Sequence, residues 1–304
     1  MIALALIAAA ALQAPAEPAA SAHELSWSAA AWFVRGDAYA VTVEIALPVG
    51  GGAIPAWMTT AAGLEIDGRA LGERGGGTLH YSGATRIALT LDVGGLLGEA
   101  PDVFRLTHAG AAGADGGVIV RALTPAPAEL DFMKIEPERL GEFLVQLDTN
   151  RGRMLFELWP DVAPNHVRNF LDLCYTGFYD GLIFHRVWPG FMIQGGDPGQ
   201  KERPKPPRSV DREFSDRKHV PGVLSMARTN HPDSATSQFF VLHAAAPGLD
   251  GQYSVFGKLV KGFDVVDGIA TAPGEAIPDL GGFRPREEQT ILRATVLHAK
   301  QGDA

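Results

Sequence analysis

The feature that most constrains the fold of this chain is a strand–turn–strand pattern between Phe184 and Asp197, where the sequence reads FHRVWPGFMIQGGD. Pro189-Gly190 marks a turn between two short apolar runs, and Gly195-Gly196 ends the second run. The pattern predicts a β-hairpin that carries one cation, Arg186, before its turn and one amide, Gln194, after it.

The side chains of this hairpin combine apolar and polar groups. Because alternate residues of a strand face opposite sides, Met192 and Gln194 are predicted to share one face. Phe191 and Ile193 then share the other face. A twist of the hairpin would bring the polar tips of Arg186 and Gln194 together over an apolar floor, which suits a ligand with an apolar end and an amide carbonyl. An ordinary hairpin with a solvated Arg186 is the alternative that this stretch alone leaves open.

The composition restricts the class of protein and of partner. The 304 residues are enough for two domains, and a hydrophobic fraction of 46% is that of a globular protein. A formal net charge of −9 argues against nucleic acid as a partner, because phosphate backbones require clustered Lys and Arg. Cys174 is the single cysteine, so the chain forms no internal disulfide, and the expected role of this residue is that of a small buried hydrophobe.

The N-terminus carries the pattern of a secretory signal. Ile2–Leu12 is an apolar run too short to span a bilayer, and Ala20-Ser21-Ala22 offers the small residues of a cleavage site after Ala22. No Lys or Arg precedes the run, which is unusual for such a signal. We predict that residues 1–22 are a signal peptide and that the mature chain is periplasmic or secreted, without stable membrane insertion after cleavage. If uncleaved, the segment is expected to be a membrane-proximal anchor or a disordered tail.

Residues 23–123 have the texture of a small all-β domain. Tyr39–Leu47 and Thr85–Val93 alternate apolar and polar residues, and Gly-rich turns such as Gly50-Gly51-Gly52 separate the candidate strands. Several short strands with such turns between them predict a β-sandwich-like fold of immunoglobulin-like size. The region has no cluster of titratable residues, so we interpret it as a binding or spacer domain whose role the sequence does not identify.

A linker and a second domain follow. Two prolines within Thr124–Ala128 deny ladder hydrogen bonds and stiffen the chain, so residues 124–142 are predicted to be a linker. From residue 143 to residue 304, many strands and two widely separated helices are predicted, which is typical of an α+β or barrel-plus-helices fold. The first helix begins at Pro164 and ends before Gly177. Its apolar stripe consists of Val167, Phe170, Leu171 and Cys174.

The usual catalytic constellations are missing from this second domain. The sequence has no Gly-rich phosphate loop, no dinucleotide fingerprint and no Ser in a nucleophile elbow. Its histidines lack the spacing of a metal site, and His185 is predicted to face away from Arg186. The candidate residues that remain are aromatics, one Arg and two Gln, without an evident proton-transfer pair. Such a set fits a reaction in which a bond is rotated rather than broken.

Six short motifs of the second domain occur in a characteristic order. They are FHR at 184–186, QGGD at 194–197, GVLSMA at 222–227, SQFF at 237–240, LDG at 249–251 and VFG at 255–257. Over roughly residues 143–298, these motifs resemble the cyclophilin family of peptidyl-prolyl cis-trans isomerases. The resemblance implies an eight-stranded antiparallel barrel capped by two helices, and hence a mainly β chain. It also implies proline-containing peptides and unfolded or folding proteins as partners, with no cofactor or metal.

The resemblance further implies roles for individual residues. It makes Arg186, Phe191 and Gln194 the catalytic residues, with Arg186 as the catalytic arginine. The substrate-binding residues that it implies are Met192, Ala227, Arg228, Gln238, Phe240, Leu249 and Tyr253. Gly248 departs from the family pattern, because cyclosporin-sensitive members carry a tryptophan at this position. Loss of that indole removes a hydrogen-bond donor and a large apolar wall, so weak cyclosporin binding is expected.

These observations lead to one functional hypothesis and two alternatives. We expect the chain to accelerate cis–trans rotation of X-Pro peptide bonds and thereby to assist the folding of exported proteins. The first alternative is a non-catalytic module that binds proline-containing peptides as a chaperone. The second alternative makes the β domain of residues 23–123 the functional part, docking to an envelope partner, with the isomerase as an accessory.

Overall fold

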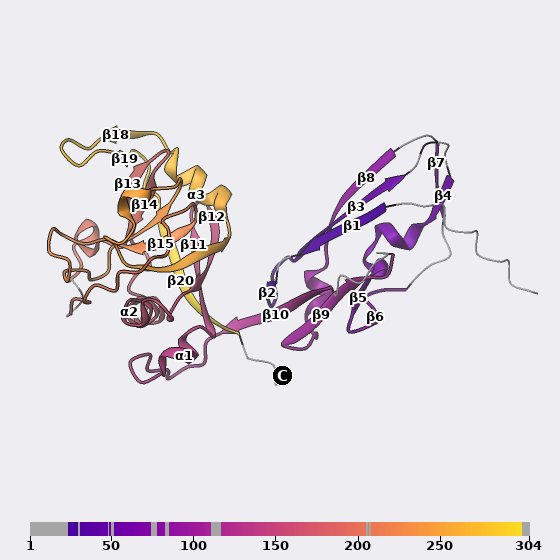
Figure 1. The fold of residues 1–304 in the computed structure, drawn as a ribbon, viewed down its shortest axis with the longest axis horizontal. Coiled ribbons are helices and arrows are strands. Elements are labelled where there is room, and N and C mark those ends of the chain that lie inside the picture. Colours follow the sequence, from indigo (N-terminus) through magenta and orange to yellow (C-terminus); the bar gives the residue numbers. More distant parts are fainter. Residues whose placement is uncertain are drawn as a thin grey trace, which may run out of the picture. The chain divides into compact units, whose positions relative to one another are not determined.

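The computed structural model describes residues 24–29, 31–47, 49, 52–73, 78–82, 85–110, 117–204, 206 and 208–299. Strands dominate this part of the chain (Figure 1), which confirms the prediction of a mainly β protein. The chain divides into two compact units, Met1–Ala122 and Leu123–Ala304. The signal segment predicted at residues 1–22 lies outside the described residues. Within the part that the structure describes, no helix combines the length and hydropathy needed to cross a bilayer.

The first unit consists of short strands around one hydrophobic core. Its first sheet contains β1 (Glu24–Ala29), β3 (Ala40–Leu47) and β8 (Thr85–Asp92). Its second group of paired strands runs in the order β10 (Val118–Pro125), β9 (Val103–His108), β5 (Leu64–Ile66) and β6 (Arg69–Ala70). Strand β2 (Trp32–Val34) also pairs with β10. A separate two-stranded sheet consists of β4 (Gly52–Pro55) and β7 (Thr78–Tyr81). Val43 and Ile45 of β3 and Leu106 of β9 are fully buried in the same core. Each of the two main sheets therefore turns one face inward.

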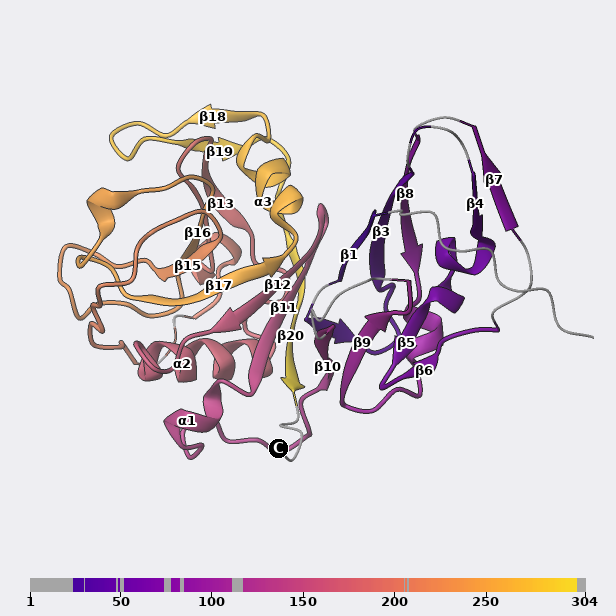
Figure 2. The ribbon, with the colours of Figure 1, turned by 45° about the vertical axis from the view of Figure 1, so that its right-hand side comes forward.

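The second unit is a ring of strands. Backbone hydrogen bonds join them in the order β13, β14, β16, β15, β17, β12, β11 and β20, and the neighbouring pairs are antiparallel. Their bounds are β11 Phe143–Thr149, β12 Gly152–Leu158, β13 Phe184–Trp188, β14 Met192–Gly195, β15 Val223–Met226, β16 Phe239–Leu242, β17 Val255–Lys261 and β20 Ile291–Ala299. Beside β13 and β20, the Ile291 N–H donates to the Leu182 carbonyl and the Phe184 N–H donates to the Gln289 carbonyl. These bonds close the ring into a barrel (Figure 2).

Helix α2 (Pro164–Tyr175) begins at the predicted proline and ends just before Gly177, which has a φ of 71°. The four residues of the predicted apolar stripe are all buried in the core of the barrel unit. Burial raises the pKa of the Cys174 thiol well above its usual range, because the thiolate would lose its hydration. Cys174 therefore packs as an inert hydrophobe, as predicted.

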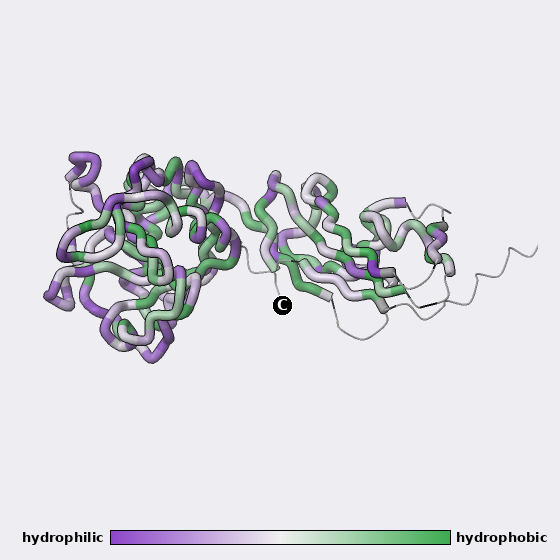
Figure 3. Tube along the Cα trace, turned by 90° about the horizontal axis from the view of Figure 1, so that it is seen from above, coloured by the Kyte–Doolittle hydropathy of each residue, from purple (hydrophilic) through white to green (hydrophobic). Residues whose placement is uncertain are grey.

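Helix α3 (Phe263–Ala270) lies at the other end of the barrel from α2 (Figures 1 and 2). Three apolar residues recur along it at helical spacing. Val266 and Ile269 are fully buried, whereas Phe263 is 42% exposed. Phe263 is the first residue of the helix, and its ring stacks on His243 instead of entering the core. Figure 3 shows the resulting distribution in this unit, with apolar segments along the inner strands and polar segments in the outer loops.

The segment predicted as a linker, residues 124–142, is packed on the barrel. Its first residues continue β10 and pair with β20, and the short helix α1 (Pro137–Leu140) follows. Phe132 is fully buried, with its ring centroid 5.2 Å from that of Phe143 and 5.4 Å from that of Tyr175. Pro125 still pairs with Leu297, and the Ala126 N–H donates to the Val296 carbonyl. Burial of the Phe132 ring then holds the rest of the segment against the barrel unit.

The last hairpin of the chain contains β18 (Gly274–Ala276) and β19 (Phe283–Pro285), in a stretch rich in Gly and Pro. Phe283 pairs with Val187 of β13, so the hairpin extends the sheet beyond that strand. The turn of the hairpin, residues 277–282, consequently lies near the strand that carries Arg186.

Candidate active site

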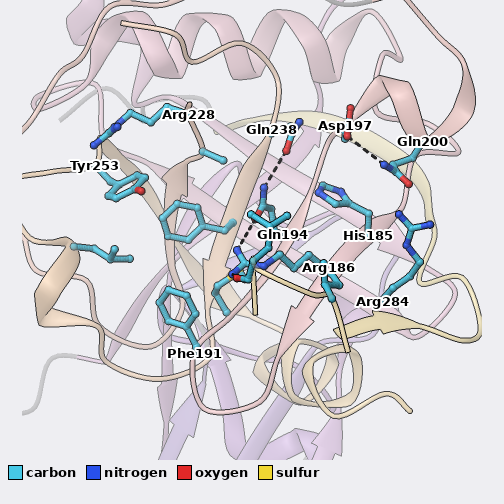
Figure 4. Close-up of a pocket in the computed structure, with 16 residues that line it drawn as sticks. His185, Arg186, Phe191, Gln194, Asp197, Gln200, Arg228, Gln238, Tyr253 and Arg284 are labelled. Atoms are coloured by element: carbon cyan, nitrogen blue, oxygen red, sulfur yellow. Dashed lines mark hydrogen bonds between the residues drawn. The ribbon is translucent and has the colours of Figure 1, made fainter. Parts of the chain in front are cut away.

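A cavity of about 530 Å³ opens beside β13, β14 and β16 (Figure 4). The predicted site residues that line it are Arg186, Phe191, Met192, Gln194, Ala227, Arg228, Gln238, Phe240, Leu249 and Tyr253. The other lining residues are His185, Asp197, Gln200, Ile277, Leu280 and Arg284. The structure thus brings together every residue that the sequence assigned to catalysis or substrate binding.

The floor of the cavity is apolar. Residues opposite each other on an antiparallel pair share a face, and β14 and β16 place Met192 opposite Leu242 and Gln194 opposite Phe240. Met192 and Phe240 are only 2% and 6% exposed, and they pack with Leu242 in a cluster separate from the barrel core. Ile193, on the other face of β14, belongs to the barrel core. The predicted alternation along this strand is therefore confirmed for these residues.

Phe191 departs from that alternation. It lies in the turn before β14 rather than in the strand, and it lines the cavity instead of sharing the buried face of Ile193. Its ring stands perpendicular to that of Trp188, with the centroids 5.5 Å apart. The predicted face of Phe191 was wrong because pleat alternation begins only where the ladder begins.

The Arg186 guanidinium lies at the edge of this floor. Arg186 pairs with Gln194 across β13 and β14, and its Nη1 donates to Gln194 Oε1 at 3.1 Å. This contact confirms the predicted approach of the two polar tips. Two further bonds come from the β18–β19 turn, where Nε donates to the Gly281 carbonyl at 3.0 Å and Nη2 donates to the Leu280 carbonyl at 2.7 Å.

The charge of Arg186 is held by neutral oxygens. Burial lowers the pKa of its guanidinium from the usual value, and the Tyr253 hydroxyl opposes that shift. An arginine pKa starts far above neutrality, so the group remains charged. Among the described residues, no carboxylate forms an ion pair with it. A cation held in this way can stabilise a lone pair or negative charge that develops in a ligand.

Gln194 and Gln238 extend the hydrogen-bond chain that starts at Arg186. Because a guanidinium can only donate, Gln194 presents its oxygen to Arg186 and its nitrogen to Gln238, whose Oε1 accepts at 2.9 Å. The Nε2 group of Gln238 then has no bonded acceptor within the described part of the chain. It is available as a donor to a ligand in the cavity.

His185 lines the cavity together with Arg186, which contradicts the prediction that the two residues face opposite sides. The register between β13 and β14 shifts between Phe184 and Arg186, so His185 is the extra residue of a β-bulge, and a bulge interrupts alternation. Burial lowers the pKa of the His185 imidazole, Asp197 opposes this shift, and Arg284 and Arg186 add to it. The bulge thus adds a neutral imidazole to the polar side of the cavity.

The opposite wall is built around Arg228 and Tyr253 (Figure 4). The Arg228 guanidinium lies 4.5 Å from the centroid of the Tyr253 ring, which is a cation–π contact. Its Nη2 donates to the Gln252 carbonyl at 3.0 Å. Tyr253 in turn packs edge-on against Phe240 at 5.8 Å. This stacking fixes the position of Arg228 and gives the wall a flat cationic surface next to the apolar floor.

The lining of the cavity carries more positive than negative charge. Arg186, Arg228 and Arg284 line it, and Asp197 is its acidic lining residue, although the whole chain has a formal charge of −9. In the part of the chain that the structure describes, no group of three or more His, Cys, Asp or Glu side chains could hold a metal ion. The groups that the cavity offers to a ligand are cations, amides and apolar surface.

Sequence reasoning missed the polar end of the cavity and the hairpin that covers part of it. Asp197 and Gln200 hydrogen-bond to each other at 3.3 Å just after β14, and the Gly-Gly-Asp motif was the signal that could have located them. Ile277, Leu280 and Arg284 belong to the β18–β19 hairpin. The only local signal of that hairpin is a Gly-Gly pair at its turn.

Comparisons with known proteins agree with this geometry. Residues 144–296 match the model of the family described as cyclophilin type peptidyl-prolyl cis-trans isomerase/CLD. A peptidyl-prolyl cis-trans isomerase of Acinetobacter baylyi is 42% identical over 151 residues, which cover 47% of this chain and 80% of the relative. Peptidyl-prolyl cis-trans isomerase B of Escherichia coli is 40% identical over 166 residues, which cover 50% of this chain and 99% of the relative.

A solved structure of a cyclophilin type peptidyl-prolyl cis-trans isomerase of Cryptosporidium parvum is 33% identical. The similarity covers 52% of this chain and 98% of that chain, with a TM-score of 0.47. The family match and the curated relatives confirm the resemblance that the sequence motifs indicated. The chain therefore belongs to the cyclophilin-type peptidyl-prolyl cis-trans isomerases.

Proposed function

We propose that the barrel of this chain rotates X-Pro peptide bonds through Arg186 and acts on proteins that fold after export. The observation that carries the catalytic part is the Arg186 guanidinium beside the apolar floor, bonded to neutral oxygens and to no carboxylate of the described residues. The apolar run Ile2–Leu12 supports the export part.

Rotation about a peptide bond is slow because the nitrogen shares its lone pair with the carbonyl, which sets a barrier of about 18–20 kcal/mol. X-Pro bonds populate both isomers and interconvert over roughly tens to hundreds of seconds. In the twisted state this conjugation is lost, and the lone pair localises on a basic nitrogen. A catalyst must therefore bind the twisted amide more tightly than either planar isomer.

Arg186 supplies this preference. Its guanidinium has five N–H donors, and three of them are bonded to neighbouring oxygens. The remaining donors can reach the prolyl nitrogen, which becomes a good acceptor only in the twisted state. The interaction is thus stronger in the transition state than in the ground state, which is the condition for catalysis.

The apolar floor holds the proline ring while the rest of the substrate turns. Met192 and Phe240 form its buried part, with Phe191 and Leu249 packed beside them. Burying the pyrrolidine there gains about 25 cal/mol per Å² of apolar surface. The free Gln238 amide can bind the substrate backbone. With the ring held, rotation is confined to the residue that precedes proline.

The variant Arg186→Ala tests the catalytic role. Removing one preorganised donor costs roughly 10²–10³-fold in kcat, and we expect kcat/KM for an Ala-Pro peptide to fall by about that factor. The thermal midpoint should change little, because Arg186 is only half-buried. A protease-coupled or NMR exchange assay on the full chain measures the rate.

The control is Arg293→Ala, which removes an exposed arginine of β20 that does not line the cavity. This variant should keep wild-type turnover. Undiminished turnover by Arg186→Ala would refute the assigned role of Arg186. Binding of proline peptides by the wild type without any turnover would instead favour the non-catalytic binding module.

A further inference from the structure

We propose that the turn between β18 and β19 is a positioning element of the active site, which holds the Arg186 guanidinium in its working orientation through the backbone carbonyls of Leu280 and Gly281. The inference rests on the proposed catalytic role of Arg186. It assigns a function to a hairpin that lies far from β13 in the sequence and extends the sheet beyond that strand.

The three nitrogen atoms of the guanidinium are each held by a different oxygen. Nε donates to Gly281, Nη2 donates to Leu280 and Nη1 donates to Gln194. A planar group bonded through all three nitrogens can neither swing about its side-chain torsions nor turn in its own plane. Gln194 alone would leave the Nε–Nη2 edge unsupported. The turn therefore supplies the two contacts that complete the orientation of Arg186.

The chemistry of these contacts suits a group that must keep its charge. Backbone carbonyls accept hydrogen bonds from a guanidinium without carrying a net charge of their own. A carboxylate in the same place would hold Arg186 as firmly, but it would cancel much of the field at the substrate nitrogen. One N–H on Nη1 and one on Nη2 also remain for the substrate. The turn thus orients the cation without neutralising it.

The turn is itself rigidly built. Asp279, Gly281 and Gly282 have φ values of 65°, 69° and 76°, and the Ile277 N–H donates to the Gly282 carbonyl at 3.0 Å. Gly281 also packs tightly against Trp188, because a β-carbon added at Gly281 would lie 2.5 Å from the indole ring. Such a turn presents its carbonyls in one arrangement.

The Trp188 indole closes the remaining side of the guanidinium. Its ring centroid lies 5.6 Å from Cζ of Arg186, within the range of a cation–π contact. Since the same indole supports Gly281, the turn and the guanidinium share one backing surface. Moving the turn away from Trp188 would therefore loosen Arg186 on two sides.

The variant Gly281→Ala tests the proposal. The added methyl group would clash with Trp188, and alanine disfavours a φ of 69°, so the turn and both carbonyls must shift. A displacement of about 1 Å near a catalytic group can cost on the order of 10²-fold in rate. We expect kcat to fall by about 10- to 100-fold, with KM for the peptide changed by less than about twofold, because the proline floor lies on other elements.

A spectroscopic readout separates positioning from general damage. In the wild type, the Hε proton of Arg186 should exchange slowly with water because it is bonded to the Gly281 carbonyl. Arg186→Lys identifies the signal by removing it from the spectrum. In Gly281→Ala the same proton should exchange as fast as those of exposed arginines. The control is Gly268→Ala on α3, where an added β-carbon meets nothing within 4 Å, and this variant should change neither the signal nor kcat.

The outcomes distinguish this inference from the function on which it rests. If the wild type fails to isomerise X-Pro peptides, the proposed function fails. If the wild type is active and Gly281→Ala keeps or exceeds its kcat, the positioning role is overturned while the function stands. If Gly281→Ala does not fold, the wild type alone decides, since a rapidly exchanging Arg186 Hε would overturn the proposal and a protected one would support it.

Discussion

Gly248 directly precedes Leu249, which lines the cavity. Gly248 is exposed within the short 3₁₀ helix Pro247–Leu249, and a β-carbon added to it would meet no atom within 4 Å. The first carbon of a side chain therefore meets no neighbour there. The tryptophan that the family resemblance puts at this position in cyclosporin-sensitive members would extend the apolar wall and add an N–H donor.

We predict that Gly248→Trp binds cyclosporin at least about tenfold more tightly than the wild type, a gain of about 1.4 kcal/mol. The restored indole adds both contact area and a hydrogen bond. An inhibition titration in the isomerase assay measures the affinity. Gly268→Trp is a matched change on α3, where an added β-carbon also meets nothing within 4 Å, and it should leave the affinity unchanged. Tight binding by the wild type would contradict this reasoning.

For single residues, the sequence located the site but not the direction of every side chain. The ten residues assigned to the site all line the cavity, because they belong to short motifs that can be recognised without a structure. Their individual roles stay predictions. The faces of Phe191 and His185 were wrong, because one residue lies in a turn and the other in a bulge. The position of a bulge depends on the register with the partner strand, which local patterns do not contain.

Among the helices, α2 begins without a capping side chain of its own, since Ala163 precedes Pro164. Glu213, which lies in a loop distant in sequence, caps the N-terminus of α2 instead. Its Oε1 accepts from the Asn165 N–H at 3.1 Å, and its Oε2 accepts from the His166 N–H at 3.0 Å. Burial opposes the ionisation of Glu213, but hydrogen bonds from His166 and Asn165 outweigh that effect and lower the pKa of the carboxylate. The helix dipole also favours a negative charge at this end.

We predict that Glu213→Gln lowers the free energy of opening of α2 by about 1–3 kcal/mol near neutral pH. Because the folded-state pKa lies below the ordinary value of 4.5, the stabilisation is present above that pH and is lost as the pH falls through the folded-state pKa. The difference between variant and wild type should therefore shrink in acid. Amide hydrogen exchange within α2 measures it at each pH.

The matched control for this prediction is Glu138→Gln, which neutralises an exposed glutamate of α1. This variant should leave the exchange of α2 unchanged at every pH. An equal loss of protection by Glu213→Gln at neutral pH and at about pH 3 would show that its charge is not involved.

The sequence predicted the helices and strands that have a buried face, because their apolar residues recur at a regular spacing. It did not predict the β18–β19 hairpin. Helix α2 had a four-residue apolar stripe, and the strands of the barrel carried alternating or continuous apolar runs. The strands β18 and β19 have three residues each and are largely exposed, so they offer no periodicity to read. Their positions are set by pairing with β13 and by the bonds to Arg186, which are tertiary contacts.

For the whole molecule, the sequence indicated two domains with a linker at residues 124–142, and in the structure this segment packs on the barrel unit. The two prolines within Thr124–Ala128 indicated a stiff linker, and nothing in the local sequence pattern marks Phe132 of this segment as buried. Its contacts with Phe143 and Tyr175 form only in the folded chain. In the first unit, the alternating apolar residues and Gly-rich turns likewise predicted strands and turns, but they did not identify a binding partner. A pull-down of envelope proteins with this unit would test the alternative in which it docks to an envelope partner.

Export is the prediction that concerns the entire chain. We predict that protein recovered outside the cytoplasm begins at His23, because Ala20-Ser21-Ala22 offers small residues to the signal peptidase. N-terminal sequencing and intact mass measure the start. The variant Ala22→Arg should block processing and leave the 22-residue segment attached. Recovery of an unprocessed wild-type chain in the cytoplasm alone would contradict the prediction, and with it the proposal that the clients are exported proteins.

The burial of Phe132 matters for any attempt to prepare the isomerase unit by itself. A fragment cut at residue 144, where the family match starts, would lose the Phe132 ring that packs on Tyr175. It would also lose the hydrogen bond from the Tyr175 hydroxyl to the Pro127 carbonyl and the pairing of residues 123–125 with β20. Freshly bared aromatic surface of this kind promotes aggregation. A fragment that keeps all of these contacts starts at Leu123, some twenty residues upstream of the point that sequence similarity alone would choose.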